Sequence, residues 1–134
     1  MRVVVDTNVF VSAALKDKSL PALAVYVVGQ RGVLLKSDAT ERQLFEVLAR
    51  PYFASLISPV THDWLKKILA AAETVTIAER IAECRYPTDD KFLALAVNGH
   101  ADLIVSGDGD LLTLNPFRGI PIIAPAAFVQ STAR

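Results

Sequence analysis

Residues 3–9 read Val-Val-Val-Asp-Thr-Asn-Val, an apolar run that ends in an acid and two polar residues before it resumes. Three successive β-branched residues without polar alternation are typical of a strand buried on both faces of a parallel sheet. Because this strand ends at Asp6, we expect the Asp6 side chain at the carboxyl edge of that sheet. The apolar residues 9–15 are numerous enough for a helix, so the segment predicts the strand-then-helix order of an α/β fold.

The remainder of the chain repeats the same alternation. Short apolar runs predict further strands at residues 33–35, 103–105 and 120–123. Longer stretches predict helices at 9–15, 21–28, 40–49, 61–73 and 90–98, and a last short helix in the tail 125–134. We therefore expect one α/β domain over residues 1–134, with a central parallel β-sheet flanked by α-helices and ligands bound beyond the carboxyl ends of the strands.

Composition indicates a compact domain away from membranes. The chain has 134 residues, of which 52% are hydrophobic, and this suffices for one core. No apolar run reaches the roughly 18–20 residues needed to cross a bilayer, and the first residues lack the pattern of a signal peptide. We therefore expect a cytoplasmic protein. The one cysteine, Cys84, cannot form an internal disulfide and is expected to be a small, partly buried residue.

Charge is balanced overall but unevenly distributed. The chain carries 14 basic and 14 acidic residues, which argues against binding nucleic acid by bulk electrostatics alone. Residues 1–67 contain nine Lys and Arg against six Asp and Glu, whereas residues 68–134 contain five against eight. Candidates for phosphate contacts, each equally open to a role as a solvated surface cation, are Arg42, Arg50, Arg85, Lys91 and Arg118.

Aspartates gather where the predicted elements meet one edge of the sheet. Asp6 ends the first strand, Asp90 begins a helix, and Asp108 and Asp110 follow the strand at 103–105. Clustered carboxylates repel one another and are costly to desolvate, so they need a cation or raised pKa values. Hard oxygen ligands suit Mg²⁺ or Mn²⁺, and a metal held there could activate water to hydrolyse a phosphodiester.

Each acidic motif also has a purely structural interpretation. Asp6 or Asn8 could cap the helix at 9–15. Asp89 could open the next helix and offset its dipole, which is the interpretation that we favour for this residue. The glycines of 107–110 permit a tight turn, whose aspartates could simply start a short helix. Turn chemistry does not require acids in all three loops, so these interpretations weaken when they are taken together.

Three segments stand in the order VVVDTNV at 3–9, TDDKFLALA at 88–96 and LIVSGDGDLL at 103–112, and they are accompanied by residues 37–51 and 121–128. Together these segments resemble the PIN-domain family, in the branch of VapC-like ribonucleases that are toxin components of bacterial toxin-antitoxin systems. The resemblance implies cleavage of single-stranded RNA that depends on Mg²⁺ or Mn²⁺, an antitoxin partner and a homodimer. It implies that the metal ligands are Asp6, Asp90 and Asp108, with Asp110 as a further ligand or water holder. It also implies that Asn8 and Ser106 orient these carboxylates by hydrogen bonds.

One residue departs from the family pattern. Where relatives place a glutamate after the second strand, this chain has Gln43, so the fourth ligand is neutral or comes from elsewhere. Glu46 points nearly away from the predicted core, with Arg42 and Arg50 four residues to either side, and a solvent ion-pair ladder is its favoured role. Glu41 is expected to belong to a helix capping box. Tyr86, where an acid is common in this branch, removes another charge from the rim.

Two other functions compete with a nuclease. A catalytically weak or inactive PIN-fold binding module, acting through RNA or an antitoxin, is favoured by Gln43. A phosphoacceptor receiver domain would need paired acids after the first strand and a late lysine, whereas this chain has Asp6 alone there and no lysine after Lys91. Trp64 is expected to be a core or interface aromatic rather than a platform for base stacking.

Overall fold

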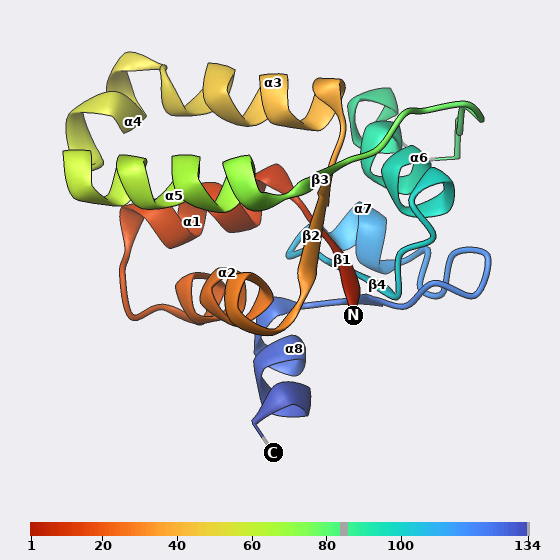
Figure 1. Ribbon diagram of the computed structural model, residues 1–134. Helices are drawn as coiled ribbons and strands as arrows, with labels where there is room; N and C mark the ends of the chain where they lie inside the picture. Colours follow the sequence, from red (N-terminus) through yellow and green to blue (C-terminus); the bar gives the residue numbers. More distant parts are fainter. Residues whose placement is uncertain (84–85, 134) are drawn as a thin grey trace.

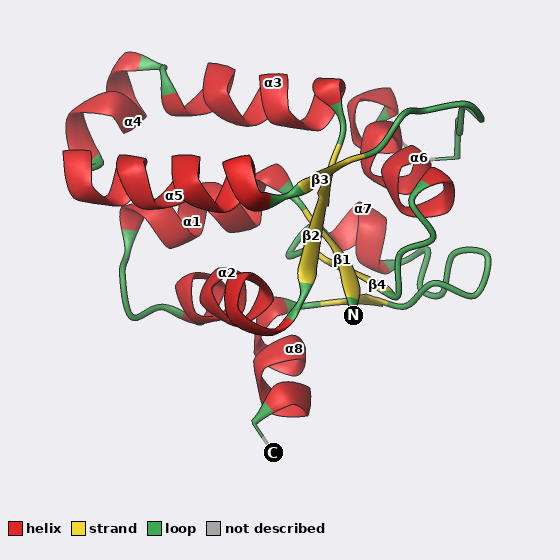
Figure 2. Ribbon diagram, viewed as in Figure 1, coloured by secondary structure: helices red, strands yellow, loops and turns green. Residues whose placement is uncertain are grey.

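The computed structural model describes residues 1–83 and 86–133 (Figure 1). The expectations for Cys84 and Arg85 fall outside these residues. The described chain contains one five-stranded sheet in the order β3-β2-β1-β4-β5, in which every pair of neighbours is parallel (Figure 2). Its strands are β1 (Arg2–Val5), β2 (Val33–Lys36), β3 (Glu73–Thr74), β4 (Leu103–Val105) and β5 (Ile122–Ile123). The predicted parallel sheet is thus confirmed.

The predicted helices are present in the structure, but most of them begin or end a few residues away from the predicted positions. They are α1 (Thr7–Leu15), α2 (Leu20–Arg31), α3 (Asp38–Leu48), α4 (Pro51–Leu56), α5 (Pro59–Ala71), α6 (Asp90–Asn98), α7 (Gly109–Leu112) and α8 (Pro125–Thr132), with a short 3₁₀ helix, η1 (Pro87–Asp89). The separate helix α4 was not predicted, because its six residues span fewer than two turns, which is too short for a helical period to show in the sequence. The strand β3 was missed because both of its residues are exposed and polar.

The sheet separates two hydrophobic clusters, because alternate residues of a strand face opposite sides. Val3 and Val5 of β1 belong to the larger cluster, which is built with α1, α2, α3, α5 and α8. Val4 belongs to the second cluster, with α6 and Leu111 of α7. Figure 1 shows these two groups of helices on opposite sides of the sheet. Trp64 packs against the larger cluster, as predicted for a core aromatic.

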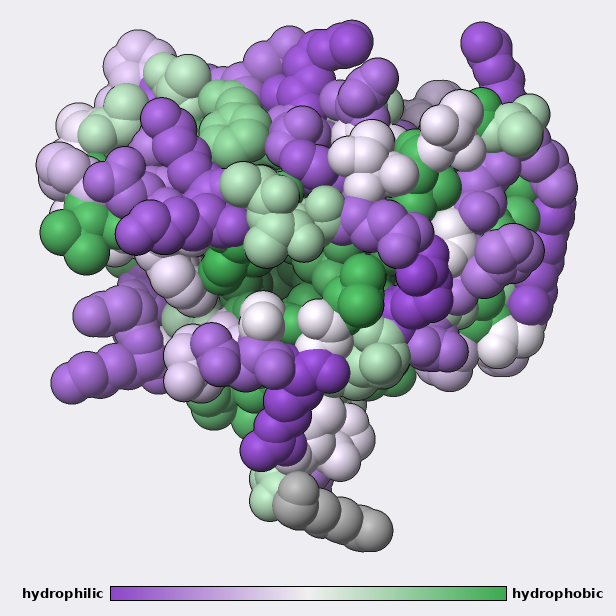
Figure 3. All heavy atoms as spheres, viewed as in Figure 1, coloured by the Kyte–Doolittle hydropathy of each residue, from purple (hydrophilic) through white to green (hydrophobic). Residues whose placement is uncertain are grey.

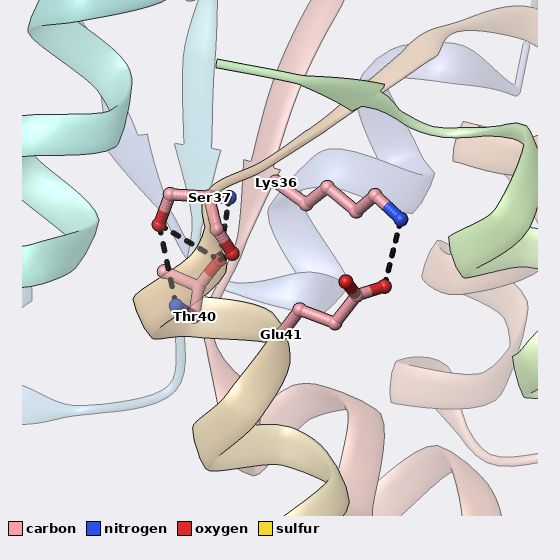
Figure 4. A network of polar contacts seen from close by, with 4 residues as sticks. All are labelled: Lys36, Ser37, Thr40 and Glu41. Carbon is pink, nitrogen blue, oxygen red and sulfur yellow. Dashed lines mark hydrogen bonds and ion pairs between the residues drawn. The ribbon is translucent and has the colours of Figure 1, made fainter. Parts of the chain in front are cut away.

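The start of α3 is fixed by a polar network at the end of β2 (Figure 4). The Ser37 backbone N–H donates to Thr40 Oγ1 at 3.0 Å, and the Thr40 N–H donates to Ser37 Oγ at 3.2 Å, which is a capping box. The prediction that Glu41 belongs to this box is wrong. Because Thr40 occupies the capping position, the Glu41 carboxylate is left to pair with Lys36 at 2.7 Å.

The carboxyl ends of β1 and β4 lie side by side at the middle of the sheet. The Asp6 N–H donates to the Val105 carbonyl at 3.0 Å, and the Ser106 N–H donates to the Ile123 carbonyl at 3.0 Å, so the ladder continues one residue past each strand. From β1 the chain proceeds to β2 on one side, and β4 lies on the other side. Such a switch point is where open α/β sheets bind ligands. None of the helices in the described part of the chain has the length and apolar character needed to cross a membrane.

Candidate functional site

Asp6 is a buried carboxylate at this switch point, with only 3% of its surface exposed. Its Oδ2 accepts a hydrogen bond from Ser106 Oγ at 2.8 Å, and its Oδ1 accepts one from the Asn8 backbone N–H at 3.3 Å, which caps α1. Burial raises the pKa of Asp6 above its usual value, and the negative charge of Asp108 adds to this, whereas the two hydrogen bonds and Lys91 oppose it. Asp6 is therefore both a helix cap and a carboxylate that gains from a nearby cation.

Ser106 connects two of the predicted acids through one buried hydroxyl. Its Oγ donates to Asp6 and accepts the backbone N–H of Asp108 at 3.0 Å. Asp108 in turn caps α7, since its Oδ1 accepts the Asp110 N–H at 3.1 Å. The structure thus brings together Asp6, Ser106 and Asp108 by hydrogen bonds, with the half-buried Asp110 on the first turn of α7 beside them.

The third carboxyl group at this place is that of Asp89, a residue that we expected to be only a helix-opening acid. Asp89 shares a side-chain hydrogen bond with Asp108 and also feels the charge of Asp6. Burial is the largest cause that raises the pKa of Asp89 to about 6, followed by the hydrogen bond and the charge of Asp108. Asp89 does open α6, as expected, because it occupies the N-cap position, but its side chain makes no capping hydrogen bond there.

Asp90, the residue predicted for this place, lies next to Asp89 but is directed elsewhere. Its Oδ1 accepts the backbone N–H of Glu83 at 3.0 Å, and it lines a separate hollow with Ser37 and Arg80. Adjacent residues at a helix start project about 100° apart, so only one of the two carboxylates faces Asp108. The sequence shows that Asp89 and Asp90 are adjacent, but it does not show which of the two side chains faces Asp108.

Lys91 supplies a positive charge beside the acids. Its Nζ donates to the Thr88 carbonyl oxygen and lies 5.5 Å from the centre of the Phe92 ring. Burial lowers the pKa of Lys91, and the charges of Asp89, Asp6 and Asp90 act in the opposite direction. Lys91 is therefore the phosphate-contact candidate that the described structure places beside the acids.

Gln43 is hydrogen-bonded to Thr7, the neighbour of Asp6 in the chain. Thr7 Oγ1, on the residue after Asp6, donates to Gln43 Oε1 at 2.8 Å. Glu46 is exposed, as expected, but within the part of the chain that the structure describes it forms no ion pair with Arg42 or Arg50. The predicted ladder is therefore absent. Long exposed side chains lose rotamer entropy when they pair, so such ladders contribute little.

The other candidates for phosphate contacts that the structure describes form no ion pair with the acids of this site. Arg118 pairs with Glu79 at 2.5 Å and stacks beside Phe117, in the loop before β5. That loop leads into the amino end of β5, at the edge opposite to Asp6. Arg42 and Arg50 are exposed on and beside α3.

The donor set suits a hard divalent cation, although the ligands are not fully assembled. Within residues 1–83 and 86–133, no three His, Cys, Asp or Glu side chains stand close enough together to bind a metal ion as they are. The Asp89–Asp108 hydrogen bond needs one proton between two carboxyl groups, and a divalent ion can replace that proton. Carboxylate oxygens are the ligands that Mg²⁺ and Mn²⁺ prefer, so the residues fit such an ion.

Comparison with known proteins agrees with this geometry, since the model of the PIN domain family matches residues 2–110. The chain belongs to the PIN domain family. The resemblance and the α/β fold expected from the sequence are thereby confirmed. PIN domains are generally nucleases and generally use divalent metals. The matched residues include Asp6, Asp89, Asp90 and Asp108, so the whole candidate site lies within the family region.

Individual relatives are more distant. The chain is 25% identical over 119 residues to the uncharacterized protein MJ1680 of Methanocaldococcus jannaschii, covering 85% of this chain and 75% of that protein. The structure of VapBC2 from Rickettsia felis, bound to a DNA fragment from their promoter, contains a similar fold with a TM-score of 0.61 and 12% identity, over 92% of this chain and 98% of the other. PAE2754 from Pyrobaculum aerophilum gives a TM-score of 0.57 at 17% identity, over 100% and 91%. At these identities the structural matches indicate the fold.

Proposed function

We propose that this PIN domain is a divalent-metal-dependent endoribonuclease that hydrolyses single-stranded RNA. The observation that carries the proposal is the hydrogen-bonded carboxyl pair of Asp89 and Asp108 beside the buried Asp6, at the carboxyl edge of the sheet. We assign Asp6, Asp89 and Asp108 as the residues that hold Mg²⁺ or Mn²⁺. Asp90, expected from the sequence to be a ligand, is the neighbouring alternative to Asp89.

The chain's own residues provide the rest of the site. A bound divalent ion supplies an activated water and stabilises the negative charge that develops on the phosphodiester. Ser106 orients Asp6 and fixes the Asp108 backbone, so both carboxylates keep their positions as substrate binds. Lys91 lies where its ammonium group can pair with the phosphate. Asp110, half-buried beside Asp108, is placed to hold a water molecule.

The test is cleavage of a labelled single-stranded RNA by purified protein with Mn²⁺, Mg²⁺ or EDTA. We expect cleavage with either metal, none with EDTA, and none from Asp6→Asn. A double-stranded RNA and a single-stranded DNA of the same sequence test the substrate class. Equal cleavage by Asp6→Asn would show that the activity comes from a contaminant or from another site.

The second candidate is a PIN-fold binding module with weak or no catalysis. Gln43 favours it, because an amide that accepts from Thr7 adds no negative charge to the metal site. The same assay separates the two functions. A module would bind the RNA, in a filter or anisotropy measurement, and leave it uncut with both metals.

We further propose that the protein is the toxin of a toxin-antitoxin pair. The similar fold in VapBC2 supports this, as does a hollow of about 470 Å³ between α1, α2 and α5. Apolar side chains gather in this region (Figure 3), and Leu23, Tyr26 and Val60 at its border are 43%, 52% and 79% exposed. Exposed apolar patches of this kind are typical of protein-binding surfaces.

Two measurements address these partner proposals. Induced expression in a bacterial host should arrest growth, and Asp6→Asn should not. Light scattering after size exclusion should give twice the chain mass of 14.5 kDa if the protein is a homodimer. Normal growth at a confirmed expression level of folded protein would contradict the toxin proposal.

A further inference from the structure

A second hollow, of about 240 Å³, opens directly beside Asp108. We call it the Asn8 hollow. Its walls come from three separate parts of the chain: α1, the start of α2, and the segment from β4 to α8. Its lining includes Asn8, Ser12, Pro21, Gly107, Asp108 and Pro125.

The polar side of the Asn8 hollow is formed by two exposed residues of α1, a helix whose buried face is apolar. Asn8 and Ser12 are four residues apart, so they share one face of α1. Both are exposed, whereas the neighbouring residues Val9, Val11 and Ala13 are buried. Within the described residues neither the Asn8 amide nor the Ser12 hydroxyl donates or accepts a side-chain hydrogen bond. Their donors and acceptors are therefore available to a ligand.

The remaining walls indicate what kind of ligand fits. Pro21 and Pro125 contribute apolar pyrrolidine rings, and no Lys or Arg lines the hollow. With the Asp108 carboxylate as one wall, a phosphate group would be repelled there. The volume lies below the roughly 300–1,000 Å³ of pockets for larger small molecules. A neutral planar ring with polar edges matches these properties.

We propose that the Asn8 hollow binds one nucleobase of the RNA strand, next to the phosphate that is cut at the acidic site. This inference rests on the proposed function, since it takes the substrate strand to pass Asp108. Single-stranded RNA is recognised through splayed bases whose edges are hydrogen-bonded, and an amide can donate and accept at one base edge. The hollow therefore gives the nuclease a preference at one position beside the cut, with Asn8 and Ser12 as the specificity-determining residues.

The experiment compares Ser12→Ala, which removes the hydroxyl, and Ser12→Leu, which also fills the hollow. Ser55→Leu is the matched control, because Ser55 is likewise an exposed helical serine but lies on α4. Each protein is given a randomised single-stranded RNA pool with Mn²⁺, and the cut sites are sequenced. We expect Ser12→Leu to raise KM about tenfold and to lose the preference at one position, with Mn²⁺ affinity unchanged. Ser12→Ala should weaken the preference, and Ser55→Leu should match the original protein.

A binding measurement keeps the inference separate from the proposed function. In EDTA, where cleavage stops, anisotropy of a labelled short RNA should show weaker binding by Ser12→Leu than by Ser55→Leu. If the original protein cuts no RNA but this difference is present, the nuclease proposal fails and the base site stands. If Ser12→Leu binds and cuts with the same KM and the same preference as the original protein, the inference is overturned.

Discussion

The Asp89 and Asp108 carboxyl groups lie within hydrogen-bonding reach of each other, and two such groups form that bond only while one of them holds a proton. The proton is bound more tightly in the folded chain than in the unfolded one, since the pKa of Asp89 is raised from an ordinary value near 3.8 to about 6. A proton between these residues therefore stabilises the metal-free fold at low pH, and this contribution is lost as the pH rises through about 6.

The first prediction concerns pH. Between pH 4 and pH 6 the folded protein binds more protons at Asp89 than the unfolded chain does, so this group makes the free energy of unfolding fall as pH rises through that window. Urea unfolding in EDTA at pH 5 and pH 7.5 should show this loss in the original protein. Asp89→Asn serves as the reference, because it removes the group while other titrations cancel. An identical pH dependence in both proteins would show that Asp89 has no raised pKa.

The second prediction separates the two adjacent acids. Asp89→Asn should lower Mn²⁺-dependent cleavage by more than about 100-fold, because it removes a proposed ligand. Asp90→Asn should retain activity within about threefold, since its amide oxygen can still accept the Glu83 N–H. Both variants are assayed at several Mn²⁺ concentrations, so that weakened metal binding is distinguished from lost chemistry. The reverse ranking would restore Asp90 as the ligand expected from the sequence.

The third prediction is that Asp108→Asn abolishes cleavage with little change in stability. Asparagine still caps α7 well, and the substitution removes like-charge repulsion with Asp6 and Asp89. Thermal unfolding in EDTA should give a Tm close to that of the original protein. Adding Mn²⁺ should raise the Tm of the original protein but not that of the variant, since the ion stabilises only a protein that binds it. Full activity in Asp108→Asn would show that the metal lies elsewhere.

Much of the fold could be predicted because it depends on local patterns. The run Val3–Val5 ending at Asp6 identifies the central strand, and alternating strands and helices identify the parallel sheet around it. What escaped prediction is short: α4 has six residues and buries none of them, and β3 is two exposed polar residues. The predicted strand at 120–123 shortened to Ile122–Ile123, because Ile120 instead pairs with Phe117 across a tight turn.

The candidate site was predictable in its loops but not in its side-chain directions. Asp6, Ser106 and Asp108 meet because neighbouring parallel strands end together, which sequence can show. Whether Asp89 or Asp90 faces them depends on the rotation of the chain at the start of α6, and no local sequence pattern predicts this rotation. The aspartates of 107–110 do start a short helix, α7, as the structural interpretation expected, although neither Gly107 nor Gly109 has a positive φ.

The fourth prediction tests the hydroxyl that connects two acids. Ser106 is fully buried, and its loss leaves the Asp6 carboxylate without its side-chain donor. Ser106→Ala should therefore lower the free energy of unfolding at neutral pH by about 1–3 kcal/mol and raise the pKa of Asp6 further. Urea unfolding at pH 7.5 measures the first effect, with Ser55→Ala as an exposed-serine control. A loss no larger than that of the control would show that Asp6 is held by other contacts.

The last prediction concerns Gln43. Glutamate has the same shape and can still accept the hydrogen bond from Thr7 Oγ1, so Gln43→Glu should fold normally. The added negative charge lies next to Thr7, the residue that follows Asp6. It should therefore raise the Mn²⁺ affinity by roughly tenfold and lower the stability of the metal-free protein. Calorimetric titration with Mn²⁺ measures the affinity, and Gln30→Glu, an exposed position on α2, controls for charge alone. Unchanged or weaker binding would place Gln43 outside the metal's surroundings, as a structural partner of Thr7.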